Sequence, residues 1–118
     1  MGLPPSNKGP IESRMSKRFH VQIPVSFTLE EQSVEGNGIV YNLSTGGCKV
    51  TSATPVSTGL YLIIRLHLPT DPSPLEVRLA VIRWAMAGDF GMAFLSIGSD
   101  QHERLQRFLN ALETNASE

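Results

Sequence analysis

The stretch LEVRLAVIRWAMAGDFGMAFLSI, residues 75–97, decides the fold because it holds two β-strands and the turn between them. From Leu75 to Val81, apolar residues alternate with charged or small ones, which is the period of a strand with one buried face. The sequence Ala-Gly-Asp at 87–89 is typical of a turn, and the apolar residues of 90–97 predict the next strand. Two strands joined by so short a turn pair in an antiparallel hairpin.

The same alternation extends N-terminally from this hairpin. It is clearest in FHVQIPVSFTLE, where every second residue from Val21 to Leu29 is apolar. Two glycines, Gly36 and Gly38, indicate a bulge or a close backbone approach in the next strand. The remaining strands are expected in SVEGNGIVYNL (33–43), CKVTS (48–52) and TGLYLIIRLHLP (58–69).

The apolar spacing changes after residue 97. Leu105, Phe108, Leu109 and Leu112 follow the i, i+3, i+4, i+7 stripe of an amphipathic helix, expected over 99–113. Six short strands in one small domain favour a closed barrel, since closure leaves no exposed edge. The expected fold is therefore mostly β: a six-stranded antiparallel β-barrel over residues 19–97, with a C-terminal α-helix covering one mouth.

Composition limits the possible functions. The 118 residues suffice for one domain with its own core, and the formal net charge of −1 gives no overall attraction to nucleic acid or anionic membrane. Cys48 has no partner for a disulfide, and there is no signal peptide or long apolar run, so a cytoplasmic chain without membrane insertion is expected. Residues 1–13, rich in Pro and Gly, are expected to form a flexible leader, and 114–118 a disordered tail.

A polar turn, NLSTGG at 42–47, separates the second and third expected strands and is longer than a hairpin requires. Gly46 and Gly47 permit positive φ and bring N–H groups to the surface, while Asn42 and Ser44 add an amide and a hydroxyl. These groups suit an anion or the edge of a purine base. The alternative is a Gly-rich hairpin in which both polar side chains bond their own backbone.

A cationic run, RMSKR at 14–18, comes directly before the first strand. The guanidinium groups of Arg14 and Arg18 suit planar, bidentate recognition of phosphate and of the guanine edge. Such runs near a terminus are also common as solvated flanks. Neither the run nor the polar turn is specific when taken alone.

Together these segments resemble the PilZ domain, a split-barrel type of fold that serves bacteria as the receptor module for cyclic di-GMP. In that family an R-x-x-x-R motif precedes the first strand and a [D/N]-x-S-x-x-G motif follows the second, as residues 14–18 and 42–47 do here. A Trp near the end of the fifth strand and a G-x-x-F in the sixth are matched by Trp84 and Gly91–Phe94. The resemblance covers 14–113.

The resemblance implies cyclic di-GMP as the ligand, no cofactor, and a switch segment at 14–18 that orders on binding. Lys17 is a further candidate if the first motif is shifted, and Trp84 could stack on a guanine, although a Trp at a strand end more often packs in the core. Asn42 stands where the family often has Asp, and a neutral amide cannot accept two N–H bonds as a carboxylate does. The implied ligand-binding residues are Arg14, Arg18, Asn42, Ser44, Gly46 and Gly47.

Two functions are therefore open. The first is a receptor that binds cyclic di-GMP and relays the signal to an unidentified protein partner as a monomer or weak dimer. The second is a PilZ-fold protein-interaction module of the pilus or motility type that binds no nucleotide. No nucleophile–base constellation or dinucleotide fingerprint appears, so no enzyme is expected. The three histidines fall on separate elements without ligand spacing, so no metal site is expected either.

Overall fold

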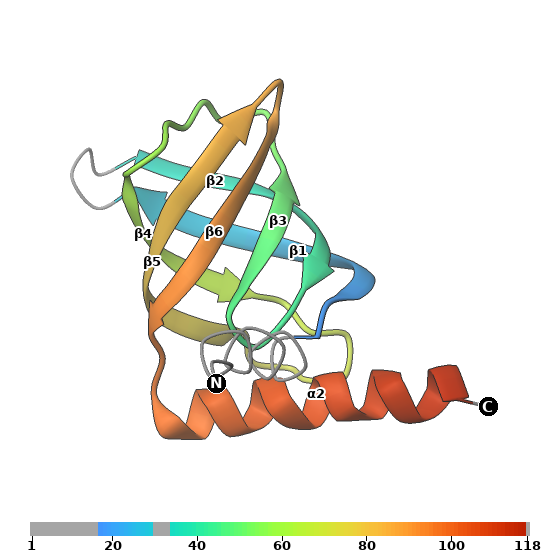
Figure 1. The fold of residues 1–118 in the computed structure, drawn as a ribbon. Helices are drawn as coiled ribbons and strands as arrows, with labels where there is room; N and C mark the ends of the chain where they lie inside the picture. The colour runs from blue at the N-terminus through green and yellow to red at the C-terminus, as the bar shows by residue number, and fades with distance from the viewer. Residues whose placement is uncertain (1–16, 30–33, 118) are drawn as a thin grey trace, which may run out of the picture.

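Six β-strands close into a barrel, and one α-helix lies across one end of it (Figure 1). The computed structural model describes residues 17–29 and 34–117. The elements are β1 (Phe19–Leu29), β2 (Val34–Leu43), β3 (Gly47–Thr51), β4 (Tyr61–Leu66), β5 (Leu75–Met86), β6 (Asp89–Ser96) and α2 (Ser99–Ser117). The strand order around the barrel is β1-β2-β3-β6-β5-β4, and every neighbouring pair is antiparallel. The expected six-stranded barrel with a C-terminal helix is confirmed.

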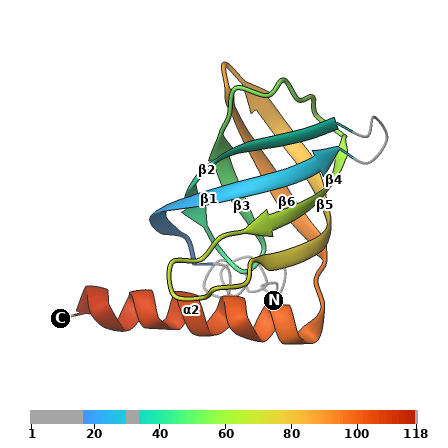
Figure 2. The same cartoon turned by 180° about the vertical axis from the view of Figure 1, so that it is seen from behind.

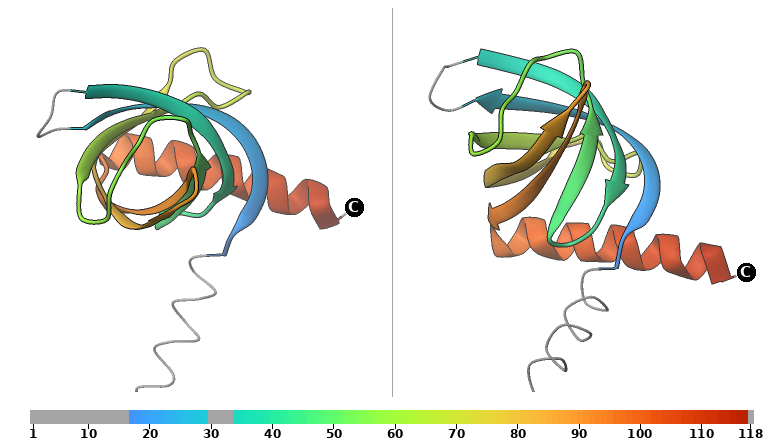
Figure 3. Two further views of the ribbon diagram at one scale, coloured as in Figure 1. Left: turned by 90° about the horizontal axis from the view of Figure 1, so that it is seen from above. Right: turned by 45° about the horizontal axis from the view of Figure 1, so that its top comes forward.

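The barrel closes where β1 pairs with β4, on the side that Figure 2 shows. Seen from above in Figure 3, the strands form a ring around the interior. Five residue pairs make this closure, from Val25 opposite Leu66 to Leu29 opposite Leu62. All four of these side chains are buried, so the closing seam is part of the core.

The hairpin of β5 and β6 turns through Ala87 and Gly88, between the paired residues Met86 and Asp89. Both central residues have positive φ, 53° and 88°, as in a type I′ turn, whose twist matches that of the flanking strands. Glycine adopts this conformation freely, whereas alanine is strained there. The predicted turn is thus confirmed.

The alternation predicted along β5 holds only at its start. Bulges shift the register between Leu79 and Ala80 and again between Ile82 and Trp84. As a result, Ala80 and Ile82 join the core cluster, and Val81 does not. A bulge adds one residue to a strand and moves the following side chains to the other face.

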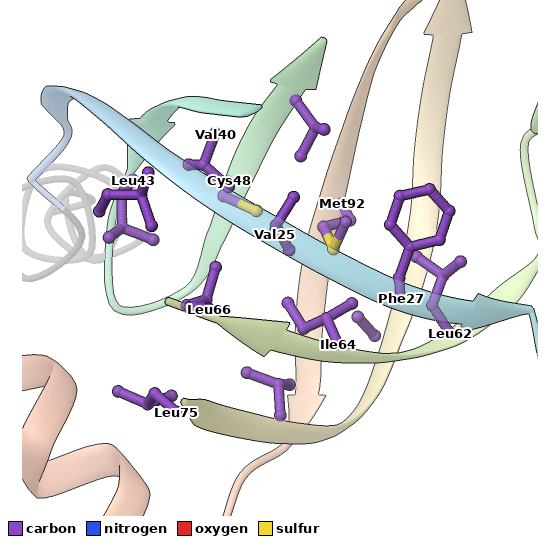
Figure 4. Close-up of a cluster of buried hydrophobic side chains, with 14 of the residues drawn as sticks. Val25, Phe27, Val40, Leu43, Cys48, Leu62, Ile64, Leu66, Leu75 and Met92 are labelled. Atoms are coloured by element: carbon purple, nitrogen blue, oxygen red, sulfur yellow. The ribbon is translucent and has the colours of Figure 1, made fainter. Parts of the chain in front are cut away.

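The interior of the barrel is filled by apolar side chains from all six strands (Figure 4). Phe27 and Phe90 meet edge to face, with ring centroids 5.6 Å apart. Phe27 pairs with Gly36, where a Cβ atom would lie 2.6 Å from the Phe27 ring. The close approach expected at Gly36 is therefore confirmed, while the irregularity of β2 in its pairing with β3 lies further along, between Val40 and Asn42.

Helix α2 covers one mouth of the barrel, as expected (Figure 1). Leu105 and Leu109 belong to the buried core, and Phe108 and Leu112 pack against it. This is the stripe that the helical spacing predicted. None of the described residues forms a helix long and apolar enough to cross a membrane.

The helix ends at Ser117, four residues beyond the expected end at 113. It thereby includes most of the stretch 114–118, for which a disordered tail was expected. No Gly or Pro follows residue 113 to stop the helix, and the Thr114 hydroxyl donates to the Asn110 carbonyl at 3.0 Å, a bond that accompanies helical backbone.

Arg104 ties α2 to the loop between β4 and β5. Its guanidinium donates to Asp71 Oδ2 at 3.0 and 3.3 Å and to the Ser73 carbonyl at 2.7 Å. Several donors of one guanidinium are thus used at once, which fixes the helix against the loop.

Candidate functional site

The segment before β1 meets the corner where β2 ends. Arg18 Nη1 donates a hydrogen bond of 2.7 Å to Asn42 Oδ1, although the two residues are 24 positions apart. The side chain of Arg18 is exposed and that of Asn42 is buried. The structure therefore brings together one predicted residue from each motif. Arg14, the other arginine of the first motif, lies outside the described residues.

The polar turn is tighter than the sequence suggests, because β2 continues to Leu43 and β3 begins at Gly47. Ser44 is only 1% exposed, and its hydroxyl donates to the Gly47 carbonyl at 3.3 Å and accepts from Gly46 N–H at 3.1 Å. Ser44 therefore shapes the turn, as the alternative interpretation proposed for it. Gly46 is the exposed residue of the turn.

Neither Gly46 nor Gly47 uses the positive φ that glycine permits. Gly47 is required for a different reason: it pairs with Ala93 of β6, and a Cβ atom on it would overlap the Met92 carbonyl oxygen. The Gly46 carbonyl accepts from Phe94 N–H at 2.9 Å. The two glycines thus let the turn pack directly on β6.

A row of cross-strand partners leads from this corner around the outside of the barrel. Asn42 pairs with Lys49 on β3, Lys49 with Gly91 on β6, and Gly91 with Trp84 on β5. Beside this row lies a hollow of about 220 Å³. It is lined by Arg18, Gly46, Cys48, Lys49, Arg83, Trp84, Gly91, Met92 and Ala93.

Trp84 lies on the outer wall, not in the core that its position at a strand end favoured. The bulge after Ile82 places Ile82 inside the barrel and leaves Trp84 37% exposed. Its indole ring covers Gly91, where a Cβ atom would lie 2.6 Å from Trp84 Cε2. Gly91 thus provides the space that the ring occupies against β6.

The hollow is cationic. Arg18, Lys49 and Arg83 line it, and no carboxylate does. A local positive site therefore exists on a chain whose formal net charge is −1. Sequence reasoning missed Lys49 and Arg83. The signal for Lys49 was its place between two buried residues of a strand, which turns its side chain outward.

Desolvation raises the pKa of one titratable group on β2 and one on β3. Burial raises the pKa of the Cys48 thiol to about 12, although the Arg18 charge acts in the opposite direction. The Cys48 side chain is buried in the core. On β2, desolvation and the Asp89 carboxylate raise the pKa of Tyr41, whose hydroxyl lies 3.5 Å from Asp89 Oδ2.

Lys17 points away from the hollow. Its Nζ lies 3.0 Å from Glu113 Oε2 on α2 and 5.7 Å from the centre of the Phe19 ring. The structure therefore places this additional candidate against the helix. This ion pair connects Lys17, the residue before Arg18, to the last turns of α2.

Comparison with known proteins agrees with this architecture. A family model described as PilZ domain matches residues 12–111. The chain belongs to the PilZ domain family. No curated protein matches its sequence.

Solved structures share the fold, two of them described as PilZ domains. The PilZ domain of CeSA from a cellulose-synthesizing bacterium is 25% identical, with a TM-score of 0.65, over 83% of this chain and 99% of that one. The PilZ domain of Escherichia coli YcgR, solved with c-di-GMP, is 17% identical, with a TM-score of 0.63, over 85% and 92% of the chains. Bacillus subtilis MotI/DgrA, an inhibitor of motility, is 20% identical with a TM-score of 0.67, and this PilZ domain spans half of it.

Proposed function

We propose that this PilZ domain is a receptor for cyclic di-GMP that uses Arg14 and Arg18 together with the turn of Asn42, Ser44, Gly46 and Gly47. The observation that carries the proposal is the 2.7 Å hydrogen bond from Arg18 to Asn42, because it joins the two motifs at a cationic hollow. The family match and the YcgR PilZ domain solved with c-di-GMP support this choice of ligand.

The geometry divides the roles within the turn. The amide of Asn42 orients Arg18 through Oδ1 and keeps its two N–H donors for a base edge or a phosphate. Ser44 acts indirectly, since its hydroxyl is committed to holding the turn. Gly46 allows the ligand to approach the backbone, because it is exposed and has no side chain.

Binding energy and ordering cost oppose each other in this site. Charge-assisted contacts contribute about 1.5–3 kcal/mol each, while ordering the backbone costs roughly 1–2 kcal/mol per residue. Two arginines then gain about 3–6 kcal/mol, and ordering the five residues of 14–18 would cost about 5–10 kcal/mol, so contacts with the turn must also contribute. Affinity should therefore be moderate and sensitive to the loss of either arginine.

The relay of the signal is proposed to pass through the N-terminal segment to a protein partner. Lys17 and Glu113 are both about half exposed, with side-chain exposures of 57% and 52%, and such ion pairs are worth about 0–1 kcal/mol. A ligand that draws residues 14–18 over the hollow can break so weak a contact. Movement of the segment would then change the surface beside α2.

Calorimetric titration of the full chain with cyclic di-GMP tests the proposal. Arg18→Ala should weaken binding about tenfold or more, the loss of one charge-assisted contact. Arg78→Ala is the matched control, because Arg78 is an exposed arginine of β5 that does not line the hollow.

Two outcomes would contradict the proposal. A folded wild-type chain that releases no heat with cyclic di-GMP would favour the interaction module without nucleotide, and equal affinities of the two arginine variants would remove Arg18 from the site. Hydrogen exchange at amides 10–20 tests the relay separately, since a segment unchanged by bound ligand would exclude it.

A further inference from the structure

Two cations of the hollow belong to neither recognised motif. Lys49 lies on β3 and Arg83 on β5, so the barrel wall, rather than the segment before β1, holds them in place. These two strands are not neighbours: β6 lies between them. The cations therefore approach the hollow from opposite sides of β6.

Gly91 lies between them, and the Trp84 indole covers it. Lys49 and Trp84 pair with Gly91 from its two sides, and adjacent strands lie about 4.8 Å apart. The backbones of Lys49 and Trp84 are thus separated by about 10 Å, and the Trp84 indole occupies the space over Gly91 between them. Lys49 and Arg83 therefore line the same hollow as the indole.

Both cations are available for a ligand. Within residues 17–29 and 34–117, no hydrogen bond or ion pair engages the side chain of Lys49 or Arg83, whereas Arg65 donates to the Ser26 and Thr28 hydroxyls and Arg104 is fixed by Asp71. Two unpaired cations facing one hollow repel each other, and a bound anion removes that cost.

We propose that Lys49 and Arg83 form a second anion subsite on the barrel wall, which binds the phosphodiester of a cyclic dinucleotide that Arg18 does not hold. This inference rests on the proposed function and extends it. Cyclic di-GMP carries two phosphodiester charges, so Arg18 can bind one phosphodiester while Lys49 and Arg83 bind the other. The wall subsite also costs little to form, since its backbone is already ordered in β3 and β5.

The expected effect follows from the loss of one charge-assisted contact. Lys49→Gln and Arg83→Gln should each weaken binding of cyclic di-GMP about tenfold, whereas Arg78→Gln should leave it within about threefold of wild type. Lys49→Arg and Arg83→Lys keep the charge and should retain most of the affinity. Calorimetry gives the dissociation constants, and thermal melting shows that each variant is folded.

Two readouts distinguish a ligand contact from a structural role. The dissociation constant should rise with salt between about 0.05 and 0.3 M in the wild type, and less steeply in either Gln variant, because screening acts on the charges that remain. Trp84 is the single tryptophan of the chain, so quenching of its emission by cyclic di-GMP reports a ligand in this hollow.

The outcomes separate the two proposals. If the wild type does not bind cyclic di-GMP, the receptor function fails and the subsite fails with it. If the wild type binds but Lys49→Gln and Arg83→Gln match Arg78→Gln in affinity and salt dependence, only the wall subsite is overturned.

Discussion

Replacing Gly91 with alanine should push Trp84 off the barrel wall. A Cβ atom at residue 91 would overlap Trp84 Nε1 and lie 2.6 Å from Trp84 Cε2, closer than real Cβ contacts. The ring, being 37% exposed, can lift toward solvent, whereas the paired backbones of β5 and β6 cannot separate without loss of hydrogen bonds. The side chain should therefore move and the strands should stay.

The cost of this change can be worked from the exposed fraction. If lifting the ring exposes a further third of an indole of about 250 Å², about 80 Å² of apolar contact is lost, or about 2 kcal/mol. Replacing glycine in a strand returns about 0.5–1 kcal/mol of backbone entropy. Gly91→Ala should therefore destabilise the fold by about 1–1.5 kcal/mol.

A double-mutant cycle checks this reasoning. Urea unfolding should show the destabilisation in the wild-type background, together with a red shift of tryptophan emission. With Trp84→Ala already present, Gly91→Ala has no ring to displace and should stabilise by about 0.5–1 kcal/mol. An equal cost of Gly91→Ala in both backgrounds would refute the steric explanation.

Three further changes follow from the same strands. Gly47→Ala should cost about 3 kcal/mol or more in urea unfolding, because its Cβ would strike the Met92 carbonyl, which is backbone and cannot swing away; a loss under about 1 kcal/mol would contradict this. Cys48 should resist thiol reagents in the native state, and rapid labelling of the folded chain would contradict this. Because folding raises its pKa from 9.0 to about 12, only the unfolded thiol ionises between these values, so the stability of the fold should fall as pH increases through that interval. Ala87→Asn should relieve backbone strain beside Gly88 and stabilise the fold by about 1 kcal/mol, which raises the melting temperature; an unchanged melting temperature would contradict this.

Periodicity was sufficient for the elements of the fold. Alternation marks a strand that separates core from solvent, so all six strands and the helical stripe of α2 were predictable. Which residues of β5 face the core was not predictable, because a bulge adds one residue to the strand and leaves no sign in an alternating pattern. For this reason, Trp84 was expected in the core, whereas it lies on the outer wall of the barrel.

The site was predictable only where a motif names its residues. The contact of Arg18 with Asn42 follows from two motifs that the family resemblance places together. Lys49 and Arg83 could not be found in this way, since β6 brings their strands to one hollow although it comes last of the three in the chain. Proximity across a barrel depends on strand order, which composition and spacing leave undetermined.

Closure of the sheet restricts how any partner can recognise this molecule. Each of the six strands has a partner on both sides, so none offers a whole free edge to which a binding protein could add a seventh strand. A partner would instead bind the exposed side chains of the barrel wall and of α2. Partner preference could therefore diverge through surface substitutions alone, while the architecture beneath stays the same.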